Sequence, residues 1–419
     1  MPPRSVTPRV AHGRDAAMHA VLAVFRREGF ADEVVRSLSQ THRLGSRETG
    51  LAMEIARGAI RHHVTIEHVL TAVARYESKR VAAPLRAILH CAAYQIIWLD
   101  RIPPHAAVDQ AVDQASRFVH RRAAGMANAV LRRLTGALLE RNAAWRAGDP
   151  RCVRTGYDSA CRFQVDVLAP MRSDADHPRH VAAATGERLE HFRSLCERFG
   201  AEQAEQIGWA RQGRPVTVLQ RNALVCDADE FARAVRDAWG PCVDLAGEAA
   251  FVSGAVNPTD LPLFRAGGAF VQDATARAAA DWLAARPGER VLDLCAAPGG
   301  KTAVLAMAMG DRGEIVACDV GASRLAPLRE NIARLRLSSA WAHPLPEEDA
   351  GGDDDVLRAD SFDAVLVDAP CSNSGVFARR PEARLGFSRR KLASLTALQV
   401  RLLHRAAACV RRGGRLVYS

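Results

Sequence analysis

The sequence predicts an all-α region followed by an α/β region built on a doubly wound parallel sheet. Two observations carry this prediction. Apolar residues recur at helical spacing through the first third of the chain, and from about residue 270 short apolar strands alternate with amphipathic helices. The composition, 48% hydrophobic and 25% charged over 419 residues, is typical of folded globular protein with room for two or three domains.

The first region, residues 1–135, is expected to form a compact helical bundle. In RDAAMHAVLAVFRREGF, Val21 and Val24 lie on one apolar stripe at helical spacing. In IPPHAAVDQAVDQASRFV, Pro103 and Pro104 suit a helix start, because a missing N–H costs nothing in the first turn. Short polar connectors between such segments favour helices that pack side by side.

Two segments of weaker pattern follow the bundle. Residues 136–185 have mixed polarity, three prolines and no sustained period, so an irregular linker or insert is expected. Residues 186–269 begin with a helical stretch. In RPVTVLQRNAL and EAAFVSGAV they then show two strands around the helix DEFARAVRDAW. This part is predicted to be a small α+β subdomain.

The last region, residues 270–419, carries the strand–helix alternation. The expected strands are ERVLDLC, GEIVACD, FDAVLVDAPC and GGRLVYS, and the helices between them are KTAVLAMAM, ASRLAPLRENIARLRL and KLASLTALQVRLLHRAAACV. Such alternation predicts a parallel sheet with helices on both faces. Ligands of these sheets bind at the carboxyl ends of the strands, so the loops at those ends are the place to search for chemistry.

The first strand ends in DLCAAPGGKT, residues 293–302. Its small residues allow a ligand close to the backbone, and a helix N-terminus follows. The second strand ends in Asp319, where a carboxylate can accept hydrogen bonds from ribose hydroxyls. Together they indicate an adenosine-bearing cofactor. The competing interpretation is a tight strand-to-helix turn with a surface aspartate.

A later strand ends in VDAPCSNSG, which presents the carboxylate of Asp368 and the thiol of Cys371 at the same edge. A lone cysteine is most often a packing residue, but this context is not typical of a core. The C5 atom of a pyrimidine is a poor nucleophile, so an enzyme that alkylates it first adds a thiolate to C6. A carboxylic acid or a lysine can assist through the polar edge of the base. The residues fit that chemistry.

The net charge of +10 points to a polyanionic partner. The chain has only three lysines (Lys79, Lys301 and Lys391), so nearly all the positive charge is arginine. Guanidinium groups match phosphate geometry and stack on bases, which favours nucleic acid. The alternative is that the genome favours arginine codons and places arginine at ordinary solvent-exposed positions, which explains the charge equally well.

Cysteine spacing and hydropathy argue against a metal or redox protein and against a membrane protein. Ten cysteines run from Cys91 to Cys409 with no CxxC pair, so we predict no zinc ribbon, no redox motif and no metal. No apolar run approaches the roughly 18–20 residues of a membrane span, and the N-terminus lacks the apolar core of a secretory signal. We expect a cytoplasmic monomer without a membrane partner.

At this point the motifs identify a family by resemblance. DLCAAPGGKT, Asp319 and DAPCSNSG resemble the RNA cytosine-C5 methyltransferases of the NOL1/NOP2/Sun family, and GAFVQDATARAAADWL resembles the lead-in to their catalytic core. RIPPHAAVDQAV with AGMANAVLRRL resembles the NusB-like RNA-binding domain of the bacterial Sun/RsmB branch. The implied fold is a Rossmann-like methyltransferase domain preceded by an all-α NusB-like domain and a small α+β connecting subdomain.

The resemblance implies S-adenosylmethionine as cofactor and ribosomal RNA as substrate, and the resemblance to the Sun/RsmB branch implies 16S RNA in particular. The cofactor-binding residues it implies are Cys295, Ala296, Ala297, Pro298, Gly299, Gly300, Lys301, Asp319 and Asp368. Asp368 is implied to lie between cofactor and target base. Cys371 is implied to assist product release, whereas the attacking cysteine belongs to a Thr-Cys motif that follows a strand of the form of GGRLVYS.

The segment RRPEARLGFSRRK directly follows the Cys371 loop and is basic. We predict that Arg379, Arg380 and Arg384 hold the RNA backbone near the site, the alternative being a solvated helix start.

Two departures from the family pattern remain. The third acidic position has no clear match, and Glu347, Glu348 and Asp349 are its candidates. The sequence ends at Ser419, just before the Thr-Cys motif, so we expect a C-terminally incomplete sheet and a truncated chain.

Two alternative functions follow. One is an RNA- and cofactor-binding module without turnover. The other is an enzyme in which Cys371 is itself the nucleophile, as in the DNA cytosine methyltransferases.

Overall fold

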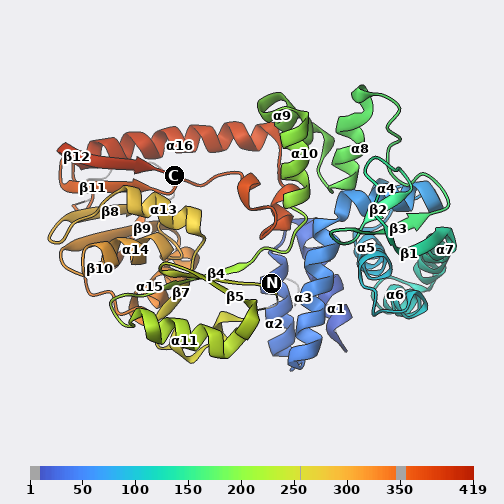
Figure 1. The fold of residues 1–419 in the computed structure, drawn as a ribbon, viewed down its shortest axis with the longest axis horizontal. Coiled ribbons are helices and arrows are strands. Elements are labelled where there is room, and N and C mark those ends of the chain that lie inside the picture. Colours follow the sequence, from blue (N-terminus) through green and yellow to red (C-terminus); the bar gives the residue numbers. More distant parts are fainter. Residues whose placement is uncertain (1–9, 255, 346–354) are drawn as a thin grey trace, which may run out of the picture. The chain divides into compact units, whose positions relative to one another are not determined.

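A computed structural model describes residues 10–254, 256–345 and 355–419. The chain divides into two compact units, and both are discontinuous along the sequence. The first comprises residues 1–213 and 373–387, and the second comprises residues 214–372 and 388–419. Figure 1 shows the elements of both units in chain order.

The first unit begins with seven helices, as the apolar spacing predicts. They are α1 (Gly13–Arg26), α2 (Ala31–Thr41), α3 (Ser46–Arg61), α4 (His63–Ala74), α5 (Ala83–Trp98), α6 (Pro104–Phe118) and α7 (Arg121–Ala137), with a 3₁₀ turn at Ser78–Arg80. Helix α5 is buried on nearly every face, as expected of a helix that is apolar all round and packed at the centre of a bundle. The ring of Tyr94 on α5 packs so closely over Gly58 of α3 that a side chain there would clash with it. The predicted helical bundle is therefore confirmed.

The prediction of an irregular segment at residues 136–185 is wrong, because these residues form regular secondary structure. The structure contains an antiparallel sheet of order β1-β3-β2, formed by β1 (Leu138–Ala144), β2 (Cys152–Arg154) and β3 (Ser159–Phe163), and then a 3₁₀ turn (Asp174–Asp176) and α8 (His177–Ala184). Phe163 and Cys161 of β3 are buried. The strands are only three to seven residues long, too short for periodicity to stand out from mixed polarity.

Two further helices and a distant segment complete the first unit. The helices are α9 (Leu189–Phe199) and α10 (Ala201–Ala210). Residues 373–387, which contain the 3₁₀ turns Ser374–Val376 and Pro381–Arg384, also belong to this unit. The domain boundaries expected from the sequence stay a prediction.

The second unit opens with an antiparallel sheet of order β5-β6-β4-β7. Its strands are β4 (Thr217–Arg221), β5 (Val243–Ala246), β6 (Ala249–Val252) and β7 (Ala269–Val271), and its helices are α11 (Ala228–Trp239) and α12 (Pro262–Arg265), with 3₁₀ turns at Gly240–Cys242 and Pro258–Asp260. The side chain of Asp227 caps α11 by accepting from Glu230 N, which explains where that helix begins. The two strands and the helix expected here are confirmed.

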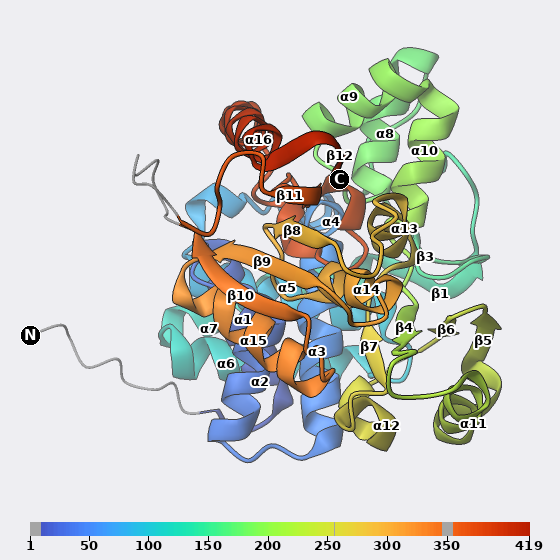
Figure 2. The ribbon, with the colours of Figure 1, turned by 90° about the vertical axis from the view of Figure 1, so that its left-hand side faces the viewer.

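The rest of this unit is a five-stranded parallel sheet of order β10-β9-β8-β11-β12, shown in Figure 2. Its strands are β8 (Arg290–Leu294), β9 (Glu314–Val320), β10 (Ala340–Leu345), β11 (Phe362–Val367) and β12 (Val410–Tyr418), and its helices are α13 (Ala274–Trp282), α14 (Gly300–Ala308), α15 (Ala322–Arg334) and α16 (Arg389–Cys409). Successive residues of each strand face opposite sides. Ala364 and Leu366 accordingly pack with residues of α14, and Val365 and Val367 pack with residues of α16. The predicted fold, a Rossmann-like α/β domain that follows a helical domain in the chain, is confirmed.

Among the residues that the structure describes, no helix has the length and apolar character required to cross a membrane.

Candidate active site

The chain winds outward in both directions from the centre of the parallel sheet. β8 lies between β9 and β11, so the winding direction reverses between β8 and β11. Leu294 and Val367, the last residues of these two strands, are register partners. Ligands of open α/β sheets bind outside the carboxyl ends of the strands at such a reversal. The loops after β8 and β11, which carry both predicted motifs, therefore begin side by side.

The loop after β8 is shaped for a close ligand. Gly299 has φ of 104°, and a Cβ at this position would lie 2.9 Å from the side chain of Leu328. Ala296 N donates to Cys318 O at 2.8 Å, which fixes the loop against β9. Helix α14 starts at Gly300 without a side-chain cap, so its first N–H groups can face an anionic or polar ligand. The predicted cradle, residues 295–301, is thus a compact turn with a helix N-terminus.

Asp319, at the end of β9, is buried, and both of its carboxylate oxygens accept hydrogen bonds. Its carboxylate accepts hydrogen bonds from Ala297 N at 2.9 Å and from Val320 N at 2.8 Å. Arg324 donates to both carboxylate oxygens, at 2.7 and 3.0 Å, and its side chain is about half exposed. A ribose diol that binds Asp319 would therefore have to compete with Arg324.

The structure brings together two residues that lie far apart in the sequence. Lys301 Nζ lies 2.7 Å from Asp368 Oδ2. The lysine is nearly buried at the start of α14, whereas the Asp368 side chain, just past β11, is 39% exposed. Asp368 N donates to Leu294 O at 3.1 Å, which fixes the backbone of Asp368 beside the end of β8. This pair links the loop after β8 to the loop after β11.

Asp293 is a buried acid that the sequence-based site omits. Thr302 Oγ1 donates to Asp293 Oδ2 at 2.6 Å, and Oδ1 has no partner within the described structure. Burial above all, and then the Asp368 carboxylate, raise the pKa of Asp293 to about 7 against the lowering effects of Thr302 and Lys301. The signal in the sequence is an acidic residue inside an otherwise apolar strand, VLDLC. Such an orphaned buried acid marks a candidate functional group.

The two cysteines near the site have different environments. Burial and, to a smaller extent, the neighbouring carboxylates raise the pKa of Cys295 to about 12, so this thiol stays protonated. Its contribution is therefore the backbone of the cradle. Cys371 is exposed, and Gln399 Nε2 on α16 donates to the adjacent Pro370 O at 2.9 Å. Of these two thiols, Cys371 is the one that an incoming base can reach.

The end of β12 lies at the same edge of the sheet. Tyr418 is the register partner of Val367, Ser419 N donates to Val367 O at 2.9 Å, and Ala369 N donates to Ser419 O at 3.2 Å. The strand GGRLVYS therefore ends beside Asp368, as a strand that delivers a side chain to this edge must do.

Two groups of predicted residues are not part of the site described above. The acidic candidates Glu347, Glu348 and Asp349 fall outside the described residues. Arg379, Arg380 and Arg384 belong to the first unit, within residues 373–387. Arg380 is exposed and Arg379 is partly buried.

The expectation that Arg384 holds RNA is wrong for the folded chain. Its side chain is only 4% exposed, because its guanidinium donates to backbone carbonyls within the unit.

One cluster in the first unit has the composition of a metal site. The possible ligand atoms of His63, Glu67 and His90 lie within 4.8 Å of one another. Contacts inside the fold explain the placement of the two imidazoles without a metal ion. His63 Nδ1 lies 3.1 Å from His90 Nε2, and His90 Nδ1 donates to Arg86 O at 2.8 Å. The expected absence of a metal stays a prediction.

The site fits a cofactor that combines a nucleoside with an amino-acid group. The uncapped start of α14 supplies N–H donors, and Asp319 lies at the position of a ribose acceptor. The unpaired oxygen of Asp293 can accept a hydrogen bond from a cationic amine. Gln272, also buried with an unpaired Oε1, lies against Gly300 in the cradle.

Comparison with known proteins agrees with this geometry. A family model described as 16S rRNA methyltransferase RsmB/F matches residues 280–419, and the NusB family model matches residues 12–136. The chain is 31% identical to the candidate methyltransferase Rv1407 of Mycobacterium tuberculosis, over 100% of this chain and 86% of that protein. It is 29% identical to ribosomal RNA small subunit methyltransferase B of Pseudomonas putida, over 99% of this chain and 85% of that protein. The solved structure of PH0851 superposes with a TM-score of 0.74 at 20% identity, covering 98% of this chain and 86% of that one, and so supports the fold.

Proposed function

Because the chain belongs to the RsmB/F family of S-adenosylmethionine-dependent rRNA methyltransferases, with a NusB-like domain before the catalytic one, we propose that it methylates C5 of a cytosine in 16S rRNA. The observation that carries the proposal is the Lys301–Asp368 contact, which joins the cofactor cradle to the loop of Cys371 at the reversal of the sheet. A cofactor on one side and a reactive pyrimidine on the other would meet at this pair. The proposal includes a cytoplasmic location and a monomeric state.

The cofactor supplies an electrophilic methyl group at this edge. We propose that backbone N–H groups of residues 295–301 hold its amino-acid end, with its amine at the unpaired oxygen of Asp293. Asp319 accepts the ribose hydroxyls once Arg324 gives up part of its contact.

The target cytosine must leave its stack to reach the edge where Asp368 and Cys371 lie. A cysteine thiolate adds to C6, so that an S–C6 bond forms and C5 becomes nucleophilic. The Asp368 carboxylate accepts a hydrogen bond from the exocyclic amino group of the cytosine, and Lys301 Nζ, 2.7 Å from Asp368 Oδ2, holds that carboxylate in place. C5 would then take the methyl group, and the S–CH3 bond of the donor would break to leave S-adenosylhomocysteine. A base removes the C5 proton, the C5–C6 double bond re-forms, and the S–C6 bond breaks to release the cysteine thiolate.

The two cysteine roles follow the family pattern. We propose that the attacking cysteine belongs to the motif after Ser419, because the end of β12 lies beside Asp368. Cys371, exposed on the neighbouring loop, assists elimination of the product.

The test uses the protein expressed from its natural gene, labelled S-adenosylmethionine and 16S rRNA, both free and in small subunits. The expected product is 5-methylcytosine after nuclease digestion. Lys301→Met and Asp368→Asn should lose most of the activity, whereas Asp281→Asn on the exposed part of α13 should not. Label on another base, or no label although RNA and cofactor bind, would contradict the proposal. The second outcome would favour a binding module without turnover.

A second assay separates the two cysteine assignments. With Cys371→Ala, cytosine RNA should still form a covalent adduct with the protein, and the adduct should persist longer than with the wild type. Loss of all adduct would assign the attack to Cys371 instead.

A further inference from the structure

The helical unit contains a small cavity that the methyl-transfer site does not use. It has a volume of about 120 Å³ and lies between the loop that joins β1 to β2 and the helices α8 and α10. Every residue that lines it belongs to the first unit. A cavity of roughly 150 Å³ accommodates a benzene ring. This cavity therefore has the size of one planar six-membered ring.

Two indole rings contribute to the wall of the cavity. Trp145 follows β1 and Trp209 lies on α10, and their ring centres are 5.5 Å apart with the planes at 74°. The Arg154 guanidinium lies 4.3 Å from the centre of the Trp145 ring and 4.9 Å from that of Trp209. Arg154 Nη2 also donates to Tyr157 O at 2.6 Å. One well-held cation thus fixes both indoles, so a planar ring that enters the cavity meets rigid aromatic surfaces.

Polar contacts fix the rest of the wall. Glu205 Oε1 accepts from Trp209 Nε1 at 3.1 Å, and Glu205 Oε2 lies 2.9 Å from His177 Nε2. Asp149, the other acidic residue of the wall, accepts from the backbone N–H two residues further on and from the thiol three residues further on. Among the described residues, His177 Nδ1 is buried and has no hydrogen-bond partner. The acids of the wall are therefore satisfied within the fold, whereas a residue of the wall keeps one unsatisfied nitrogen.

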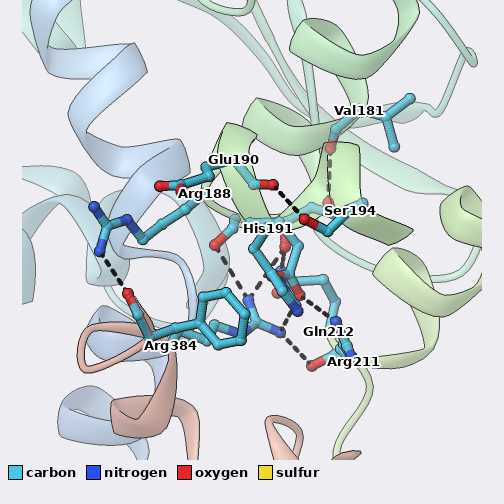
Figure 3. A network of polar contacts seen from close by, with 12 residues as sticks. Val181, Arg188, Glu190, His191, Ser194, Arg211, Gln212 and Arg384 are labelled. Carbon is cyan, nitrogen blue, oxygen red and sulfur yellow. Dashed lines mark hydrogen bonds and ion pairs between the residues drawn. The ribbon is translucent and has the colours of Figure 1, made fainter. Parts of the chain in front are cut away.

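The two helices beside the cavity are held together at their ends. Figure 3 shows the buried guanidinium of Arg384 among backbone carbonyls. Its Nη1 donates to Thr185 O at 3.2 Å, at the end of α8, and its Nη2 donates to Arg211 O at 3.0 Å, at the end of α10. All three residues belong to the first unit. The cavity is therefore preformed, and a ligand would bind without the cost of ordering its walls.

The mouth of the cavity combines an apolar side chain with positive charge. Arg146 and Met171 line the cavity and are exposed. Gly148 has φ of 76°, and a Cβ there would lie 2.7 Å from Met171 Cε, so the loop approaches the methionine closely. Arg172, the residue after Met171, is exposed as well. Neither arginine forms an ion pair with a described residue, so both guanidinium groups can bind a phosphate.

We propose that this cavity binds an unpaired pyrimidine base of the RNA, with the neighbouring phosphate at Arg146. The six-membered ring of a pyrimidine matches the cavity in size, whereas the double ring of a purine exceeds it. Unstacked bases in single-stranded RNA are recognised by stacking on aromatic side chains. The chain belongs to a family of rRNA methyltransferases, so RNA is the polyanion that it meets. The cavity adds affinity for RNA and takes no part in the methyl transfer.

The first test locates the contact on the wild-type protein. The protein is irradiated with a single-stranded oligonucleotide of 4-thiouridine, and the crosslinked peptides are identified by mass spectrometry. Crosslinks are expected within residues 145–152, 171–184 or 205–209. The oligonucleotide contains no cytosine, so the result does not depend on the proposed methylation. The absence of crosslinks from all three segments would overturn the proposal.

The second test fills the cavity without removing a polar contact. Ala184, half-buried at the end of α8, lines the cavity, so Ala184→Leu should occupy its volume. Affinity for a uridine oligomer should fall about tenfold, the range of one lost stacking contact. Ala201→Leu, exposed at the start of α10 and not part of the wall, is the matched control and should stay within about twofold of the wild type. An adenine oligomer should lose little affinity in either variant.

A second variant covers the possibility that Ala184→Leu does not fold. Met171→Trp places a larger side chain at the exposed mouth and should weaken binding of the uridine oligomer in the same way. A folded variant that binds the uridine oligomer as tightly as the wild type would overturn the proposal, as would an equal loss for the adenine oligomer. A wild type that binds in the cavity but makes no 5-methylcytosine would overturn only the proposed function.

Discussion

Two buried carboxylates, one in each unit, have opposite electrostatic environments. Glu187 in the helical unit is 1% exposed and contacts Arg384, Arg211 and His191, which together lower its pKa. Asp293 in the parallel sheet is fully buried but accepts one hydrogen bond, from Thr302, and its pKa is raised to about 7.

This difference in hydrogen-bond partners distinguishes a carboxylate with a structural role from one that can bind a ligand. A buried charge whose partners all come from the chain is already satisfied and holds its elements together. A buried acid with a missing partner carries a cost that a ligand can remove. Burial alone therefore does not identify a site; the satisfied or unsatisfied state of the group does.

The largest expected effect concerns stability. Glu187→Leu leaves Arg384 and Arg211 buried without a counter-ion, so the free energy of unfolding should fall by about 3–5 kcal/mol. Urea unfolding followed by the circular dichroism of the helices measures it. A loss below about 1 kcal/mol would mean that the network contributes little.

Asp293→Asn should change stability in the other direction at alkaline pH. The folded-state pKa of about 7 lies above the ordinary value of 3.8, so the folded protein binds more protons than the unfolded one between these values. The stability that Asp293 contributes is therefore full at low pH and is lost as the pH rises toward 7. At pH 8 the variant should melt at the wild-type temperature or above it. A clear drop in melting temperature would show that Asp293 is satisfied in a way that its contacts do not account for.

Cofactor affinity is the next largest effect. If the unpaired oxygen of Asp293 accepts from the cofactor amine, Asp293→Asn should weaken binding of S-adenosylmethionine by roughly 10- to 100-fold, the range of a charge-assisted hydrogen bond. Isothermal titration calorimetry measures it, with Asp281→Asn as the control. Unaltered affinity would remove Asp293 from the cofactor site.

The same contact predicts a pH dependence of moderate size. The amine pairs with the carboxylate form of Asp293, so cofactor affinity should fall as the pH drops through about 7. The expected change is about tenfold from pH 8 to pH 6, since at pH 6 about one molecule in ten carries the carboxylate. Asp293→Asn should flatten the profile. A profile that the substitution leaves unchanged would assign the titration to another group.

The smallest expected effect is a change of cofactor affinity, and it follows from a comparison of two arginines. Arg384 is buried among carbonyls, whereas Arg324 is half exposed and occupies the carboxylate of Asp319. Removing a competitor for that carboxylate should help ribose binding, so Arg324→Ala should tighten the affinity for S-adenosylmethionine about two- to fivefold. Weaker binding would instead mean that Arg324 itself contacts the cofactor.

The parallel sheet could be predicted because buried strands such as VLDLC and FDAVLV are short, mostly apolar runs between turn residues. The cradle and the Asp368–Cys371 loop could be placed because carboxyl ends of adjacent strands share one edge. The antiparallel sheet at residues 138–163 was missed because its strands are too short for a period to show.

Arg384 could not be distinguished from Arg379 and Arg380 on sequence alone. Its burial depends on Glu187, a residue far away in the chain, and on carbonyls from three other elements. Asp293 stood inside a recognised motif, but an unpaired oxygen is a property of the folded neighbourhood and leaves no mark in the sequence.

The path of the chain through residues 373–387 also limits modularity. The sheet unit is interrupted by a segment of the helical unit, and only afterwards does the chain form α16 and β12. No single cut of the polypeptide can therefore separate the two units. A fragment starting at residue 214 would carry Phe377 and Arg384 without the residues that bury them. On the ribosome, β12 would be synthesised only after every residue of the helical unit. Gene fusions and domain exchanges in this architecture must move both pieces of each unit together.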